Sequence, residues 1–167
     1  MQTTSQVQGG NAIEILLNDH TTIKQLLTRL VQSQETQQRT QVLEQLKGIL
    51  TLHNAVEENL VYPALNKVAH KKSESMKLYN ETAEADVLLF ELDTMLKTGA
   101  TEEFEAKAKK FQGAVLEHIE DEEEKAFPHL RDGADPSQQA MLTKSVHEFR
   151  QKFVSGTMMP KTTTGEA

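Results

Sequence analysis

Two copies of one polar motif, each placed on what is otherwise the apolar face of a helix, constrain this chain more than any other feature. The segment HNAVEENLVYPAL begins at His53, and the segment HIEDEEEKAFPHL begins at His118. Each copy reads His, three residues, two Glu, three residues, an aromatic residue, Pro, one residue and Leu. Residues four apart share one face of a helix, so His53 with Glu57, and His118 with Glu122, point in the same direction.

The apolar residues recur at alternating spacings of three and four, which is typical of helices with one buried face. Four long helices are expected at about residues 13–30, 43–62, 74–97 and 104–127, and a shorter fifth helix at about 142–153. We expect the third to bury Met76, Asn80, Glu84, Val87 and Met95, and the second to end near Pro63. Short links between long helices predict an all-α fold, an antiparallel up-down four-helix bundle with an additional short C-terminal helix.

The helical bundle is expected to occupy residues 11–154 as one domain, a usual size for a chain of 167 residues. The segments 1–10 and 155–167 are polar, with Gly and Thr prominent, and are interpreted as flexible tails.

The composition excludes several classes of site and partner. There is no Cys, which rules out disulfides, iron–sulfur clusters, thiolate zinc sites and thiol nucleophiles, so that any metal must be held by imidazole and oxygen. The net charge of −7 and the lack of a basic run argue against nucleic acid or an anionic membrane as a partner. No apolar run is long enough to span a membrane and no secretory signal is visible, which indicates a cytoplasmic protein.

Five polar residues fall on positions where the helical pattern expects apolar ones. They are His20, His53, Glu57, His118 and Glu122. An antiparallel arrangement brings them to a similar height in the bundle, where buried carboxylates are costly unless their charge is compensated. Since no Arg or Lys lies on these faces, metal ions are the expected source of positive charge. Imidazole and carboxylate donors suit iron, manganese or zinc, and two His-x-x-x-Glu pairs favour two ions over one.

With these motifs the chain resembles the hemerythrin-like family, the HHE cation-binding domains, over about residues 12–130. The resemblance rests on LLNDHTTIKQLL around His20 and on the two repeated segments. It implies a non-haem centre of two iron ions with an oxo, hydroxo or water bridge. Glu57 and Glu122 would be bridging carboxylates, and His20, His53 and His118 terminal ligands. Glu58 and Glu123 are expected to face outward or to hydrogen-bond these ligands.

The third helix departs from the family pattern, which has histidine there, whereas this chain reads YNETAEADVLLFEL. Aligning the apolar run places Glu84 where the histidine should stand, so Glu84 is the predicted substitute ligand. Glu81, Tyr62 and Tyr79 are weaker candidates. His70, His129 and His147 are expected to lie outside the site.

A site richer in carboxylates favours ferric iron and oxidative turnover over reversible dioxygen carriage. The chain also resembles the hemerythrin-like proteins of mycobacteria, for which hydrogen peroxide decomposition and nitric oxide handling are the implied roles. We therefore expect a peroxidase- or catalase-like oxidoreductase with no catalytic residues beyond the metal ligands. The alternatives are a dioxygen or iron carrier or sensor without turnover, and a structural zinc or manganese bundle. The sequence leaves the oligomeric state and the electron donor open.

Overall fold

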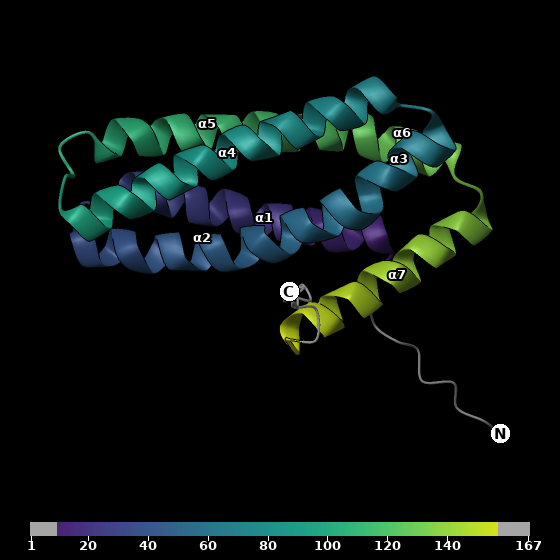
Figure 1. The fold of residues 1–167 in the computed structure, drawn as a ribbon, viewed down its shortest axis with the longest axis horizontal. Helices are drawn as coiled ribbons and strands as arrows, with labels where there is room; N and C mark the ends of the chain where they lie inside the picture. The colour runs from purple at the N-terminus through teal and green to yellow at the C-terminus, as the bar shows by residue number, and fades with distance from the viewer. Residues whose placement is uncertain (1–9, 157–167) are drawn as a thin grey trace, which may run out of the picture.

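The computed structural model describes residues 10–156, which form five continuous helices and no strand. Their segments are α1 (Ala12–Gln32); α2 (Thr36–Val56), η1 (Glu57–Val61) and α3 (Tyr62–Ala69); α4 (Lys72–Thr98); α5 (Phe104–Asp121), η2 (Glu122–Ala126) and α6 (Phe127–Gly133); and α7 (Pro136–Val154). The first four helices run antiparallel with α1 and α2 on one side and α4 and α5 on the other (Figure 1). The predicted all-α bundle with a fifth helix is confirmed. The expected tails lie outside the described residues, except for residues 10, 155 and 156.

The helix ends follow local sequence signals. Asn11 accepts a hydrogen bond from the backbone N–H of Glu14, whose carboxylate in turn accepts from the N–H of Asn11, so the two form a capping box at the start of α1. A second capping box, formed by Asp135 and Gln138, starts α7. Gly99 ends α4 with φ of 77°, a left-handed conformation that glycine adopts at little cost.

The two repeated motifs form π-helical turns at corresponding places. Each five-residue π segment begins at the first Glu of the motif's Glu pair, Glu57 in η1 and Glu122 in η2. The N–H of Tyr62 donates to the carbonyl of Glu57, five residues earlier, and the N–H of Phe127 does the same with Glu122. Single π turns inside α-helices are often found at functional sites.

The prolines of the motifs do not end their helices, contrary to the expectation that the second helix stops near Pro63. That helix continues to Ala69, because proline is tolerated in the first turn of a new helical segment. Proline has no N–H, so the carbonyl of Glu58, which would face that N–H across the π turn, needs another donor. The Tyr79 hydroxyl of α4 donates to it at 2.8 Å.

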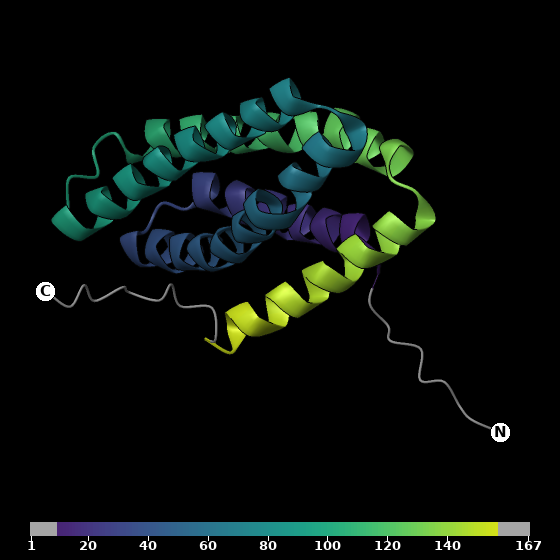
Figure 2. The same cartoon turned by 45° about the vertical axis from the view of Figure 1, so that its right-hand side comes forward.

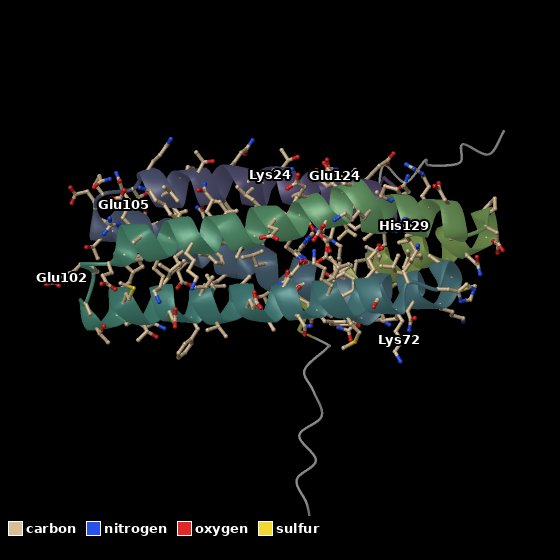
Figure 3. The ribbon with its side chains drawn as sticks, turned by 90° about the horizontal axis from the view of Figure 1, so that it is seen from above. Lys24, Lys72, Glu102, Glu105, Glu124 and His129 are labelled. Atoms are coloured by element: carbon tan, nitrogen blue, oxygen red, sulfur yellow. The ribbon has the colours of Figure 1, made fainter. Side chains whose placement is uncertain are left out.

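The apolar core consists of two clusters separated along the bundle. One lies toward the α4–α5 turn and includes Leu27, Leu46, Leu92, Phe104 and Phe111; the other lies toward α3 and α6 and includes Leu16, Leu65, Leu78, Leu130 and Val146. In Figure 3, Glu102 marks the end of the bundle nearest the first cluster, and His129 lies toward the opposite end. The polar residues of the repeated motifs lie between the two clusters.

Helix α4 is rotated relative to its expected orientation. Its buried side chains include Leu78, Thr82, Leu88 and Leu92, whereas Met76, Asn80 and Glu84 of the expected inner face are exposed. Val87, also expected inside, is 58% exposed, and Met95 packs against the core. The helix carries apolar residues on both faces, so spacing alone could not identify the buried one.

Helix α7 leaves the end of the bundle and runs back obliquely beside α1 and α2 (Figures 1 and 2). It contacts α1, α2 and η1. Val146 is fully buried there, and the Thr143 hydroxyl accepts a hydrogen bond of 3.1 Å from the N–H of Ala12. Among the described residues, no helix combines the length and apolarity needed to cross a membrane.

The Tyr79 contact gives a test of the π turn. In Tyr79→Phe the ring is kept but the Glu58 carbonyl loses its donor, so the free energy of unfolding in urea should fall by about 1 to 2 kcal/mol. Thr94→Ala removes a hydroxyl from the exposed face of the same helix and should change it by less than about 0.5 kcal/mol. Equal effects of the two substitutions would contradict a role for Tyr79 in stabilising the turn.

Candidate metal centre

The five polar residues predicted to lie inside the bundle come together in one buried cluster. They are His20 of α1, His53 of α2, Glu57 of η1, His118 of α5 and Glu122 of η2. His20, Glu57 and Glu122 are 0% exposed, His53 is 2% exposed and His118 is 7% exposed. The bundle therefore holds two carboxylates and three imidazoles away from water, between its two apolar clusters.

Four of these residues converge on one point, which we call the first donor group: His20, His53, Glu57 and Glu122. Each offers one ligand atom, and the four atoms lie within 4.8 Å of one another. Nε2 of His53 is 2.9 Å from Oε1 of Glu57, and Nε2 of His20 is 3.1 Å from Oε2 of Glu122. Such separations suit neighbouring ligands of one metal ion at bonds of about 2.0–2.2 Å.

Three atoms of the first donor group have no hydrogen-bond partner although they are buried. They are Nε2 of His20, Oε1 of Glu57 and Oε2 of Glu122. Buried polar atoms in folded proteins are nearly always paired, and unpaired ones call for a specific explanation. A cation at the convergence point would contact all three, so these atoms fit a metal ion.

A second donor group, formed by His118 and Tyr62, lies on the other side of the carboxylates of Glu57 and Glu122. The Tyr62 hydroxyl donates toward Oε1 of Glu122 at 2.8 Å and lies 3.2 Å from Oε2 of Glu57. Nε2 of His118 is 3.2 Å from the same hydroxyl oxygen and 3.4 Å from Oε1 of Glu122. Glu57 and Glu122 thus each present one oxygen to each donor group.

Each histidine is oriented by a carboxylate at its other ring nitrogen. The pairs are His20 Nδ1 with Glu123 at 2.9 Å, His53 Nδ1 with Asp19 at 3.1 Å, and His118 Nδ1 with Glu81 at 3.1 Å. An ionised carboxylate can only accept, so each Nδ1 donates. Nε2 of each imidazole therefore faces the centre, where it can bind a metal ion that displaces any proton on it, as in histidines that bind metal.

Each of the three orienting carboxylates has a cationic partner of its own. Glu123 pairs with Lys24 at 3.0 Å, Asp19 with Arg150 at 2.7 Å, and Glu81 with Lys77 at 3.1 Å. Lys24 lies along one edge of the bundle (Figure 3). The outer carboxylates are therefore compensated from outside, and the charge of Glu57 and Glu122 is left to the centre itself.

The pKa values of the central groups reflect this surplus of negative charge. Burial by itself lowers the pKa of the His53 imidazole, but the Glu57, Asp19 and Glu122 carboxylates together outweigh it and raise that pKa to about 10. His118 behaves alike, because Glu122, Glu57 and Glu81 together raise its pKa to about 12 against the effect of burial. Burial, together with Glu57 and Glu122, raises the pKa of Tyr62 well above its ordinary value. The interior therefore favours any bound positive charge.

The third-helix candidates lie differently from the prediction. Glu84 is exposed on α4 and does not join the cluster, because the rotation of the helix turns Thr82 inward instead. Glu81 contacts His118 as an orienting carboxylate rather than reaching the centre. The Tyr79 hydroxyl bonds to the Glu58 carbonyl, whereas Tyr62 reaches the centre.

Sequence reasoning missed two residues around the site, Asp19 and Arg150. The signal available in the sequence was an acidic residue directly before His20, a histidine predicted to be buried. In the structure Asp19 is indeed buried, at 8% exposure. Arg150 had no such signal, because its contact with Asp19 spans 131 residues of sequence. Glu123 was expected either to face outward or to hydrogen-bond a ligand, and it hydrogen-bonds His20.

Comparisons with known proteins agree with a cation site in a helical bundle. The sequence model of the Hemerythrin HHE cation binding domain family matches residues 11–130. The DNA nickase of Nostoc sp. is 25% identical over 134 residues, which span 80% of this chain but only 37% of that protein. The crystal structure of a hemerythrin HHE cation binding domain-containing protein from Mycobacterium kansasii superimposes with a TM-score of 0.75. That match covers 95% of this chain and 96% of the other at 20% identity, and it establishes likeness of fold.

The unpaired atoms of the first donor group predict that a divalent metal stabilises the fold. At a free metal concentration of about 100 times Kd, the free energy of unfolding should rise by about 2.7 kcal/mol, seen as a higher Tm. Glu57→Gln removes charge from both donor groups and should abolish most of this rise. Glu84→Gln makes the same chemical change at the exposed position and should keep it. A rise that depends on Glu84 and not on Glu57 would contradict this location of the site.

Proposed function

The chain belongs to the hemerythrin HHE cation-binding family, and from this premise we propose that it is a non-haem diiron protein that reacts with hydrogen peroxide, nitric oxide or both. The observation that carries the proposal is the orientation of Glu57 and Glu122. Each directs one oxygen to the first donor group and the other to the second. Two carboxylates shared in this way suit a pair of ions rather than a single one.

The assignment of ligands follows from these two groups. His20 and His53 would hold one iron ion, His118 and Tyr62 the other, and Glu57 and Glu122 would bridge them, together with an oxo, hydroxo or water bridge. The donor set contains no sulfur, and nitrogen and oxygen donors of this kind are typical of non-haem iron. Glu84 is not part of the assignment, since its side chain is exposed.

When bound, iron supplies the capacity to change between the ferrous and ferric states and to bind small oxidants. The chain supplies a buried compartment, with Glu57 and Glu122 fully excluded from water, and imidazoles held in one orientation. Three histidines each offer one nitrogen, whereas two carboxylates and a phenol together offer five oxygens. Oxygen donors therefore outnumber nitrogen donors at this site. Anionic oxygen donors stabilise the ferric state, which supports oxidative turnover over reversible dioxygen carriage.

The proposal predicts two iron ions per chain and rapid loss of hydrogen peroxide. The metal-free protein would be loaded anaerobically with ferrous iron, analysed for iron, and mixed with peroxide or nitric oxide while absorbance and dissolved oxygen are followed. Glu57→Gln should lose both iron and activity, and Glu84→Gln should retain them.

Two other results would replace the proposal. A reversible oxygenated spectrum that survives several cycles without consuming peroxide would indicate a carrier or sensor. Stoichiometric zinc with no iron, in protein produced without added metal, would indicate a structural site.

The position of Tyr62 gives a spectroscopic prediction. Burial and the two carboxylates oppose ionisation of its hydroxyl, so a phenolate forms there only if a cation contacts it directly. Ferric protein should therefore show a visible phenolate-to-iron absorption band that is lost in Tyr62→Phe. Tyr79→Phe alters the tyrosine that packs edge-on against Tyr62 and should keep the band. A band that persists in Tyr62→Phe would exclude Tyr62 as a ligand.

A further inference from the structure

Helix α7 lies beyond residues 11–130, which the family model matches, yet it reaches the metal centre through one side chain. Arg150 donates from Nη1 to Oδ2 of Asp19 at 2.7 Å and from Nη2 to Oδ1 at 3.3 Å. Oδ2 of Asp19 also lies 3.1 Å from Nδ1 of His53. A continuous chain of contacts therefore runs from α7 through α1 to a predicted ligand on α2.

This chain of contacts is more constrained than the two equivalent ones. The side chains of Lys24 and Lys77 are 43% and 53% exposed. Lys24 also reaches both oxygens of Glu123, at 3.0 and 3.2 Å, but through a single ammonium group, which acts as a mobile point charge. The Arg150 side chain is 28% exposed, and its planar guanidinium holds both oxygens of Asp19. Paired contacts of this type fix the carboxylate plane as well as its distance. His53 is thus the ligand whose orientation is most firmly set from outside the bundle.

Contacts other than that of Arg150 also hold α7 against the bundle. Val146 is fully buried against the bundle, Thr143 accepts the N–H of Ala12, and a capping box forms the helix start. Removing the guanidinium should therefore leave α7 in place. The loss of the guanidinium should instead affect Asp19, whose carboxylate would no longer be held in one plane beside His53.

We infer that Arg150 is a positioning residue of the metal centre. It holds Asp19 so that Asp19 accepts the Nδ1–H of His53 and directs Nε2 at the first donor group. By this contact α7 would help to retain an ion bound there, whereas within residues 10–156 the second donor group, with His118 and Tyr62, has no arginine contact of this type. The inference rests on the proposed function, because it concerns how firmly that site holds iron.

The test compares iron release from the loaded protein in three variants. Arg150→Ala removes the contact with Asp19, and Arg150→Lys keeps the positive charge but cannot make the paired contact with both oxygens. Arg131→Ala is the control, because it removes an exposed arginine that pairs only with its neighbour Asp132 among the contacts described. Release of reduced iron to an excess of chelator would be followed with time. Arg150→Ala should release one of two ions about 10- to 100-fold faster, Arg150→Lys should be intermediate, and Arg131→Ala should match the wild type.

A second measurement separates positioning from loss of structure. Cobalt(II) would be bound to each variant, because its visible spectrum reports the geometry of the ligands, and urea unfolding of the metal-free proteins would be recorded alongside. Arg150→Ala should alter the cobalt spectrum while helical content stays at the wild-type level. Asp19→Asn, which keeps the side-chain volume, should reproduce the change and serves as the test if Arg150→Ala does not fold.

The outcomes distinguish this inference from the proposed function. If the wild type takes up neither iron nor cobalt, the proposed function fails and this inference falls with it. If the wild type retains iron and Arg150→Ala releases it at the wild-type rate with an unchanged cobalt spectrum, the inference alone is overturned. Faster release from Arg131→Ala equal to that from Arg150→Ala would overturn it as well.

Discussion

The burial of two carboxylates at the centre of a helical bundle is the constraint on which the rest of the structure depends. Glu57 and Glu122 are excluded from water, and isolated buried charges of this kind are too costly to keep without compensation. Three imidazoles and a phenol surround them, yet three buried atoms still lack partners. The lysine and arginine ion pairs compensate the outer carboxylates, and only the imidazoles lie within ion-pair distance of Glu57 and Glu122 among the described residues. A cation centre accounts for this pattern, and the apolar clusters on either side keep it dry.

The repeated motif serves geometry as well as chemistry. In each copy the carboxylate that reaches the centre opens a π turn, and the proline follows directly after the aromatic residue that closes it. The copies differ at that aromatic residue. Tyr62 places its hydroxyl at the second donor group, whereas Phe127 stacks on His20 with ring centroids 5.6 Å apart. The two copies of the motif thus form two halves of the site that differ in chemistry.

The surroundings of the three histidines are also unequal. His20 and His118 are oriented by carboxylates whose lysine partners are about half exposed, but the carboxylate of His53 is held by a less exposed arginine from α7. The fifth helix, which the bundle does not need for closure, therefore has a defined contact with the site. In this arrangement the firmness with which a ligand is held depends on long-range contacts rather than on the ligand motif.

The sequence by itself determined the helices, the polar layer and the five residues that meet in it, because helical periodicity and the His-x-x-x-Glu spacing are local properties of the chain. Tertiary structure alone decided which face of α4 is buried, and it placed Glu84 in solvent and Glu81 beside His118. It also decided the contact between Asp19 and Arg150. Local spacing cannot predict the buried face of α4, because this helix has apolar residues on both faces and the packing of the bundle selects one of them. Nor can it predict the contact of Arg150 with Asp19, because these residues lie 131 positions apart and meet only when α7 packs beside α1.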